Sequence, residues 1–103
     1  MKMVPTDFLQ NVYSRLGEVP FGKVTTYKRL AMAVKTKAYR SVGNAMRSNK
    51  DLTNIKCFKV VKSDGSLGGY ALGAREKIRR LKAEGIEVKD GKIVDFKKKL
   101  FTF

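Results

Sequence analysis

Residues 25–49, TTYKRLAMAVKTKAYRSVGNAMRSN, decide the fold that we expect for this chain. A threonine at position 25 or 26 can cap a first short helix, which ends before the polar turn KTKA. In the second half, Val42, Ala45 and Met46 recur at helical spacing among basic and small side chains. Two short helices around a tight polar turn are typical of a helix-turn-helix, although two successive helices also occur in many small α-containing domains.

The segments on either side of this stretch predict further helices and a hairpin. Residues 8–16 have apolar positions at helical spacing and are followed by Gly17, and residues 74–84 form a basic amphipathic pattern. Residues 86–96, IEVKDGKIVDF, alternate around an Asp-Gly turn and predict a β-hairpin. We therefore predict one α+β domain over residues 1–103: a small winged-helix-like domain with a helix-turn-helix, short strands and a C-terminal β-hairpin.

The composition supports one packed domain and excludes several kinds of chemistry. A single cysteine allows no internal disulfide, and the absence of histidine excludes a Cys/His zinc site, a Cys-His dyad and the usual serine triad. We predict no metal and no cofactor. Because no apolar run is long enough to span a bilayer and the opening MKMVPTDF lacks the long apolar core of a signal peptide, we expect no membrane association. The expected location is intracellular: cytoplasmic and nucleoid-associated, or nuclear in a eukaryote.

The charge of the chain indicates a polyanionic partner. Lysine and arginine number 23 against 9 acidic residues, a net charge of +14 that is spread along the whole sequence. Nucleic acid is the first interpretation of such a balance. The alternatives are an anionic membrane surface, suggested by the closing KKKLFTF, and solubility alone.

The only cysteine, Cys57, lies in NIKCFKVV, residues 54–61, which we interpret as a short, mostly apolar strand. On composition alone, a lone cysteine in such a strand is usually an inert core residue. A turn, SDGS, and a glycine-rich segment, SLGGYALG, follow it. This segment lacks the lysine and hydroxyl pattern of a P-loop and is expected to form an irregular loop.

Several separated segments together resemble the C-terminal DNA-binding and catalytic domain of the O6-alkylguanine-DNA alkyltransferases. They are FLQNVYSRLGEVPFGKVTTYKRLA, YRSVGNAMRSN, IKCFKVV, SDGSLGGYALG and KIRRLKAEG. The resemblance rests on their order and on the eight positions from Asn49 to Cys57, and it covers nearly the whole chain. It implies the activity of a methylated-DNA–protein-cysteine methyltransferase acting on double-stranded DNA that contains O6-alkylguanine.

The resemblance also implies a role for individual residues. Cys57 would take the alkyl group by direct displacement and be consumed, and Arg40 would enter the duplex and fill the gap left by a flipped nucleotide. Tyr27 matches the tyrosine that pushes on the target phosphate, and Tyr70 matches the loop tyrosine that can donate to the departing guanine. The other implied DNA-binding residues, of which the small ones allow a close approach to the minor groove, are Ser41, Gly43, Ala45 and Arg47. The base pocket would be completed by Asn49, Val60 and Ala71.

The match fails within the active-site signature. Where the family has Pro-Cys-His-Arg-Val, this chain has KCFKV at residues 56–60, so Phe58 replaces the histidine that draws the proton from the thiol. Glu84 matches the glutamate that holds that histidine. An isolated thiol with a pKa of about 8.5 is only about 3% thiolate at pH 7. Because Lys59 shares a face with Cys57 on an extended strand, we expect Lys59, oriented by Glu84, to promote ionisation of the thiol.

The replacement of histidine leaves two functional hypotheses. The first is a slow, single-turnover transfer of the alkyl group to Cys57 by a monomeric protein. The second follows from a resemblance to the alkyltransferase-like proteins, which bind alkylated guanine without removing the alkyl group and generally lack the cysteine. A protein of that kind would signal to another repair pathway, so that other repair proteins are expected partners.

Overall fold

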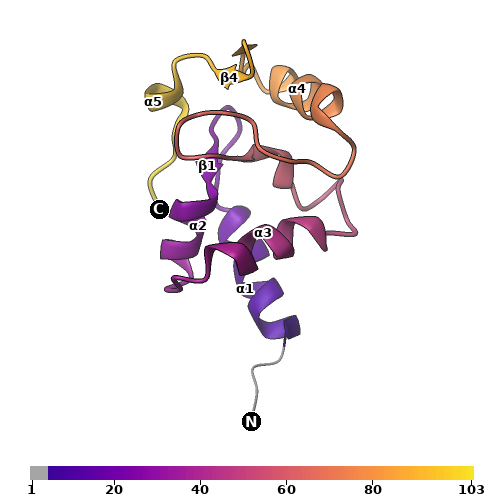
Figure 1. The fold of residues 1–103 in the computed structure, drawn as a ribbon, viewed down its shortest axis with the longest axis vertical. Coiled ribbons are helices and arrows are strands. Elements are labelled where there is room, and N and C mark those ends of the chain that lie inside the picture. Colours follow the sequence, from indigo (N-terminus) through magenta and orange to yellow (C-terminus); the bar gives the residue numbers. More distant parts are fainter. Residues whose placement is uncertain (1–4) are drawn as a thin grey trace.

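The computed structural model describes residues 5–103 and confirms the predicted α+β fold (Figure 1). The helices are α1 (Pro5–Leu16), α2 (Tyr27–Ala33), α3 (Tyr39–Arg47), α4 (Ala74–Ala83) and α5 (Phe96–Lys99), and a 3-10 turn, η1, spans Cys57–Lys59. The strands are β1 (Thr25–Thr26), β2 (Val60–Val61), β3 (Val88–Lys89) and β4 (Lys92–Ile93). Helices α1, α2 and α3 gather at one end of the molecule, and α4 lies with the β3–β4 hairpin at the other.

Helices α2 and α3 form the predicted helix-turn-helix. Thr26 caps α2, because its side-chain oxygen accepts a hydrogen bond from the backbone N–H of Arg29 at 3.0 Å. The inner face of α3 buries Val42, Ala45 and Met46 against the rest of the domain. The helical spacing of these apolar residues therefore correctly predicted which side of α3 faces the core, and the opposite side faces solvent.

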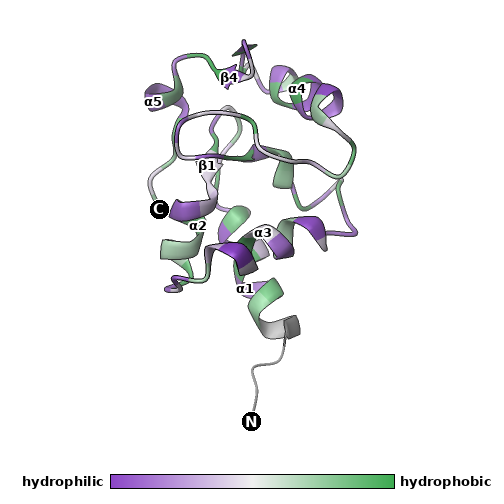
Figure 2. Cartoon of the chain, viewed as in Figure 1, coloured by the Kyte–Doolittle hydropathy of each residue, from purple (hydrophilic) through white to green (hydrophobic). Residues whose placement is uncertain are grey.

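Two apolar clusters stabilise the domain, and the residues of η1 divide between them. Cys57 packs with residues of α1, α2 and α3, whereas Phe58 packs with Leu81, Ile86 and Ile93 near α4 and the hairpin. Figure 2 shows that α1 carries both hydrophobic and hydrophilic residues, while α4 and α5 are mainly hydrophilic. Adjacent side chains thus face different cores, with Cys57 on the side of the helix-turn-helix.

The segment around Cys57 differs from the prediction of one extended strand. Residues 57–59 form η1, and only Val60 and Val61 are extended, pairing in parallel with β1. Residues 57–60 are all buried, which a strand with one solvent-exposed face cannot achieve. The 3-10 turn lets successive side chains point in three directions, so the argument that Cys57 and Lys59 share a strand face is wrong.

The C-terminal region confirms the hairpin and gives the closing residues a structural role. Strands β3 and β4 are antiparallel, and Asp90 and Gly91 both have positive φ, 52° and 74°, as a tight hairpin turn requires. Leu100 then pairs beside Val24, and the phenyl ring of Phe101 packs on the core that contains Cys57. The apolar half of KKKLFTF therefore closes the domain.

Within residues 5–103, no helix has the length and apolar character needed to cross a bilayer. The same residues contain no group of three or more acidic, cysteine or histidine side chains that could hold a metal ion.

Candidate functional site

A cavity of about 690 Å³ opens between α2, α3 and the glycine-rich loop. Its volume lies in the range of sites that hold small organic ligands. Its lining residues are Tyr27, Tyr39, Gly43, Met46, Arg47, Lys62, Gly68, Gly69, Tyr70 and Ala71. Three residues predicted for the base pocket, Tyr27, Tyr70 and Ala71, thus meet at one cavity.

The other two predicted pocket residues lie deeper in the protein. Asn49 is 6% exposed and Val60 is fully buried, and neither lines the cavity. The cavity and the apolar cluster that contains Cys57 share three residues: Tyr27, Met46 and Tyr70 line the cavity and also pack in that cluster. The sulfur therefore lies behind the cavity wall rather than at the molecular surface.

The sulfur of Cys57 has a hydrogen-bond donor beside it. The side-chain amide nitrogen of Asn49 donates to Cys57 Sγ at 3.3 Å and to the carbonyl oxygen of Ile55 at 2.8 Å. The Asn49 Oδ1 accepts from the backbone N–H of Asp51 at 2.8 Å. One side chain thus fixes the turn after α3 and presents a donor N–H group to the thiol.

Two tyrosines of the cavity are perturbed by their surroundings. Burial raises the pKa of Tyr27, and the nearby Cys57 raises it further. Burial also raises the pKa of Tyr70, against the opposing effect of Arg80, whose guanidinium lies 5.8 Å from the centroid of the Tyr70 ring. Among the described residues, the buried hydroxyl of Tyr70 has no hydrogen-bond partner. The Tyr70 hydroxyl is thus a buried donor at the cavity, beside the Arg80 side chain.

The glycine-rich loop approaches Tyr27 so closely that one position requires glycine. Gly68 has a φ of +71°, and a Cβ there would lie 3.2 Å from the hydroxyl oxygen of Tyr27. Gly69 differs, because a Cβ at that position meets nothing within 4 Å. Gly68 thus allows the loop to pack on Tyr27 and to form one wall of the cavity.

A buried lysine that the sequence analysis did not single out holds this loop in place. The ammonium group of Lys77 donates to the carbonyl oxygens of Val60 at 2.8 Å, Leu67 at 2.5 Å and Gly69 at 3.0 Å. Lys77 is fully buried, and burial lowers its pKa to about 8 while Cys57 acts in the opposite direction. Its position four residues before Leu81, on the inner face of α4, is the sequence signal that could have revealed it.

The predicted contact between Lys59 and Glu84 is confirmed. Lys59 Nζ lies 2.9 Å from Glu84 Oε1, and both side chains are nearly inaccessible, at 2% and 6%. Lys59 also donates to the carbonyl oxygens of Val19 and Pro20 at 3.3 Å and 2.7 Å. Burial lowers the pKa of Lys59, and Glu84 counteracts this shift. Among the described residues, no hydrogen bond joins Lys59 to Cys57. The ion pair instead ties η1 to the end of α4, and the two carbonyl contacts tie it to the loop before β1.

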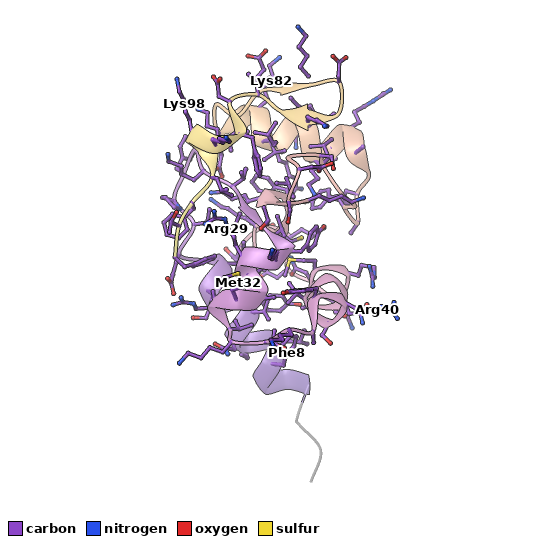
Figure 3. All side chains as sticks on the ribbon, turned by 60° about the vertical axis from the view of Figure 1, so that its left-hand side comes forward. Phe8, Arg29, Met32, Arg40, Lys82 and Lys98 are labelled. Atoms are coloured by element: carbon purple, nitrogen blue, oxygen red, sulfur yellow. The ribbon has the colours of Figure 1, made fainter. Side chains whose placement is uncertain are left out.

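The exposed side of α3 is the candidate DNA-binding surface. Arg40 is exposed and points away from the body of the protein (Figure 3). Residues 19–50 contain eight lysines and arginines and no acidic residue. Gly43 and Arg47 border the cavity, and Ser41 is half-buried. The prediction that Ala45 lies at the DNA surface is wrong: it is 1% exposed and packs in the core, because helical spacing places it on the side of Val42.

Comparison with known proteins accounts for this arrangement. The family model described as "6-O-methylguanine DNA methyltransferase, DNA binding domain" matches residues 7–86. The chain belongs to this family. The family match covers α2, α3, the cavity, Cys57 and α4, so the described site lies entirely within the matched residues.

Two curated relatives of this member of the 6-O-methylguanine DNA methyltransferase family are bifunctional proteins. A bifunctional methyltransferase/endonuclease of Picrophilus torridus is 50% identical and covers 97% of this chain and 34% of its own length. A protein of the same name from Thermoplasma volcanium is 42% identical and covers 92% of this chain and 30% of its own length. The chain thus spans about a third of these curated relatives.

The structural similarity extends over the full chain. Atl1 of S. pombe, solved in complex with damaged DNA that contains O6-carboxymethylguanine, has a TM-score of 0.85 and 27% identity, and the match covers 100% of both chains. Together with the family match, this similarity shows that the chain has the fold of the DNA-binding domain of this family, which it shares with Atl1.

Proposed function

We propose that this protein binds duplex DNA through α3, takes a flipped O6-alkylguanine into the cavity and transfers the alkyl group once to Cys57. The observation that carries the proposal is the hydrogen bond from Asn49 to the retained sulfur, directly behind the cavity wall. An inert core cysteine has no need of a buried amide donor. A cysteine that reacts as a thiolate is stabilised by one.

In the proposed reaction, the thiolate of Cys57 attacks the alkyl carbon, and the bond between that carbon and O6 of guanine breaks. The thiol proton has passed to water when the thiolate forms. The electron pair of the broken bond passes to guanine, which takes a proton from the Tyr70 hydroxyl, and water then returns one proton to Tyr70, so that the protons balance. A thioether and an unmodified guanine result. Because the thioether is not reversed, each protein acts once. The proposed reaction needs no cofactor, since Cys57 itself accepts the alkyl group.

This chain has no histidine that could take the proton from the thiol. In the proposed reaction, neighbouring groups therefore have to stabilise the thiolate once the proton has left. We assign this role to two buried groups, the amide of Asn49 and the ammonium of Lys77. Both favour the negative form of a nearby sulfur, one by hydrogen bonding and the other by charge. Lys59 is less suitable, because Glu84 and two carbonyl oxygens already engage its ammonium group.

DNA binding in this proposal depends on Arg40 and on the basic segment that includes α2 and α3. Arg40 fills the gap that the extruded nucleotide leaves, and Tyr27 and Arg47 lie at the cavity that receives the base. In this proposal the protein is an intracellular monomer that acts on DNA.

The test is incubation with a duplex that carries O6-methylguanine, followed by peptide mass spectrometry. We expect a methyl adduct on Cys57 only, and no adduct on a Cys57→Ser variant that binds the same duplex equally well. Tight binding of the lesion with no adduct after prolonged incubation at raised pH would reject the transfer reaction.

The second candidate function is binding without transfer, which two observations favour. Phe58 replaces the histidine of the family signature, and the similarity to Atl1 covers both chains completely. A protein of this kind holds the alkylated base and recruits another repair activity.

For either candidate, we infer that an endonuclease is a partner. The two bifunctional relatives are named for a methyltransferase and an endonuclease, and about two thirds of each lies outside the match to this chain. Joining the two activities in one polypeptide indicates that they act on the same damaged DNA. The partner activity lies either in a further segment of the same polypeptide or in a separate protein.

A further inference from the structure

One of the four large exposed apolar side chains of the described residues lines the cavity that is proposed to receive the base, which we call the lesion cavity. In the described part of the chain, the exposed group comprises Phe21, Met32, Tyr39 and Leu72. Tyr39 lines the lesion cavity, and Leu72 directly follows Ala71 of its wall. Phe21 is the most exposed of the four, at 72%, and lies elsewhere.

Phe21 borders a second hollow, of about 380 Å³, which we call the Phe21 groove. Its apolar lining includes Leu52, Phe58 and Ala83, and it shares no lining residue with the lesion cavity. An isolated exposed apolar residue is ordinary, but one beside a hollow with an apolar floor is a feature of binding surfaces. The groove is therefore separate from the site that receives the base.

The walls of the Phe21 groove are linked to one another by hydrogen bonds. The backbone N–H of Gly22 donates to Glu84 Oε1 at 3.0 Å, which ties the loop carrying Phe21 to the end of α4. Arg80 donates to the carbonyl oxygen of Leu52 at 3.0 Å, which ties α4 to the opposite wall. Because these links form the groove before any partner arrives, binding there orders few groups.

The exposed charges at the rim of the Phe21 groove are mainly positive. The side chains of Lys56 and Arg79 are 50% and 67% exposed, although Arg79 pairs with Glu76 at 2.5 Å and Lys56 lies 3.7 Å from Glu84. With Arg80, the lining still has three basic residues against one acidic residue, so positive charge is in excess. Glu84 is 6% exposed and already paired with Lys59, so it offers little negative charge to a partner. The complementary ligand is an apolar side chain flanked by carboxylates.

We propose that the Phe21 groove docks the endonuclease module that acts with this protein, through an apolar side chain with acidic neighbours. This inference rests on the endonuclease partner proposed above. It assigns the partner to a surface that leaves α3 and the lesion cavity open for DNA. A bound lesion and a docked nuclease can then be present on the protein at the same time.

The test uses the part of the Picrophilus torridus relative outside its match to this chain, produced separately and shown by its nuclease activity to be folded. We expect this segment to bind the intact protein in a calorimetric titration. Phe21→Ala and Arg79→Glu should each weaken binding about tenfold or more, as central interface residues do. Two matched controls, Met32→Ala and Lys82→Glu, alter exposed residues outside the groove and should bind unchanged.

A second arm keeps the inference testable if the separate segment is inactive. In a hybrid protein, this chain replaces the matched region of the relative, and the nuclease activity is measured with and without Phe21→Ala. Loss of nicking near the lesion with retained general nuclease activity supports docking. Equal binding and equal nicking by the wild-type and Phe21→Ala proteins would overturn it, as would a Phe21→Ala variant that loses DNA affinity instead. Alkyl transfer by Phe21→Ala reports separately on the proposed reaction.

Discussion

The side-chain amide of Asn49 donates a hydrogen bond to the sulfur of Cys57 at 3.3 Å, between the end of α3 and the start of η1. A thiolate accepts such a bond more strongly than a thiol does, and the proposed transfer relies on this difference. The hydrogen bond also connects the turn after α3 to Cys57 through a single side chain.

Asn49→Asp tests this contact. The variant keeps an acceptor for the N–H of Asp51 but replaces the donor to sulfur with a negative charge. We expect the transfer rate at neutral pH to fall about tenfold or more, because a hydrogen bond to a charged group contributes about 1.5–3 kcal/mol. The rate measured against pH should also shift to higher pH. An unchanged profile would remove Asn49 from the account.

Phe58→His tests whether the missing imidazole limits the reaction. Phe58 and Glu84 line the same groove, so an imidazole at position 58 can approach the carboxylate. We expect transfer to become about tenfold faster or more, with a new dependence on a group of pKa about 6.5. The matched control, Phe58→Leu, carries no proton and should gain nothing. Equal rates for both variants would mean that Asn49 and Lys77 suffice.

Gly68→Ala and Gly69→Ala form a pair that tests the wall of the cavity. A Cβ at Gly68 would lie 3.2 Å from the Tyr27 hydroxyl oxygen, and Gly68 has a φ of +71°, which side chains rarely adopt. A Cβ at Gly69 would meet nothing within 4 Å. We expect Gly68→Ala to lower the unfolding free energy by about 1 kcal/mol or more and to slow transfer. Gly69→Ala should resemble the wild type in both measurements. Equal behaviour of the two variants would contradict the described loop.

Lys77→Met tests the buried ammonium through the pH dependence of stability. The pKa of Lys77 falls from 10.5 to about 8 on folding, so between these values the unfolded chain binds more protons than the folded protein. The unfolding free energy of the wild type should therefore rise with pH from about 8 upwards. Urea titrations of both proteins isolate this contribution, because Lys77→Met lacks it. Parallel curves for the two proteins would show that the ammonium is not perturbed.

Arg40→Ala tests the DNA-binding surface. Arg40 is exposed on α3, and Lys98 lies on the other side of the protein in the view of Figure 3. We expect Arg40→Ala to weaken binding to a lesion-containing duplex by about 1–3 kcal/mol in a fluorescence titration. Lys98→Ala, which removes an equal charge, should have a much smaller effect. Equal losses would reduce the role of Arg40 to general electrostatic attraction.

The parts of the fold with a clear local signal could be predicted from the sequence. Helical spacing and threonine capping identified the helix-turn-helix, and Asp90-Gly91 identified the hairpin. The turn at Cys57 could not be predicted, because residues 57–61 are all buried and their sequence has no periodicity that separates a strand from a 3-10 turn.

The residues that line the candidate site could be predicted better than the hydrogen bonds that hold the site together. Tyr27, Tyr70 and Ala71 meet at the cavity, as the family resemblance implies. Lys77 was missed because a lysine in a basic helix is expected at the surface, and only tertiary structure provides the three carbonyl oxygens that bury it. The hydrogen bond from Asn49 to Cys57 likewise depends on a turn that brings two separated segments together.

The most direct measurement is a titration of the protein with an excess of duplex that carries radiolabelled O6-methylguanine. If the thiolate of Cys57 is the acceptor, label on the protein rises to one methyl group per molecule and stops, and Cys57→Ser takes up none. A protein that saturates with the damaged duplex and carries no label at any time would contradict the account.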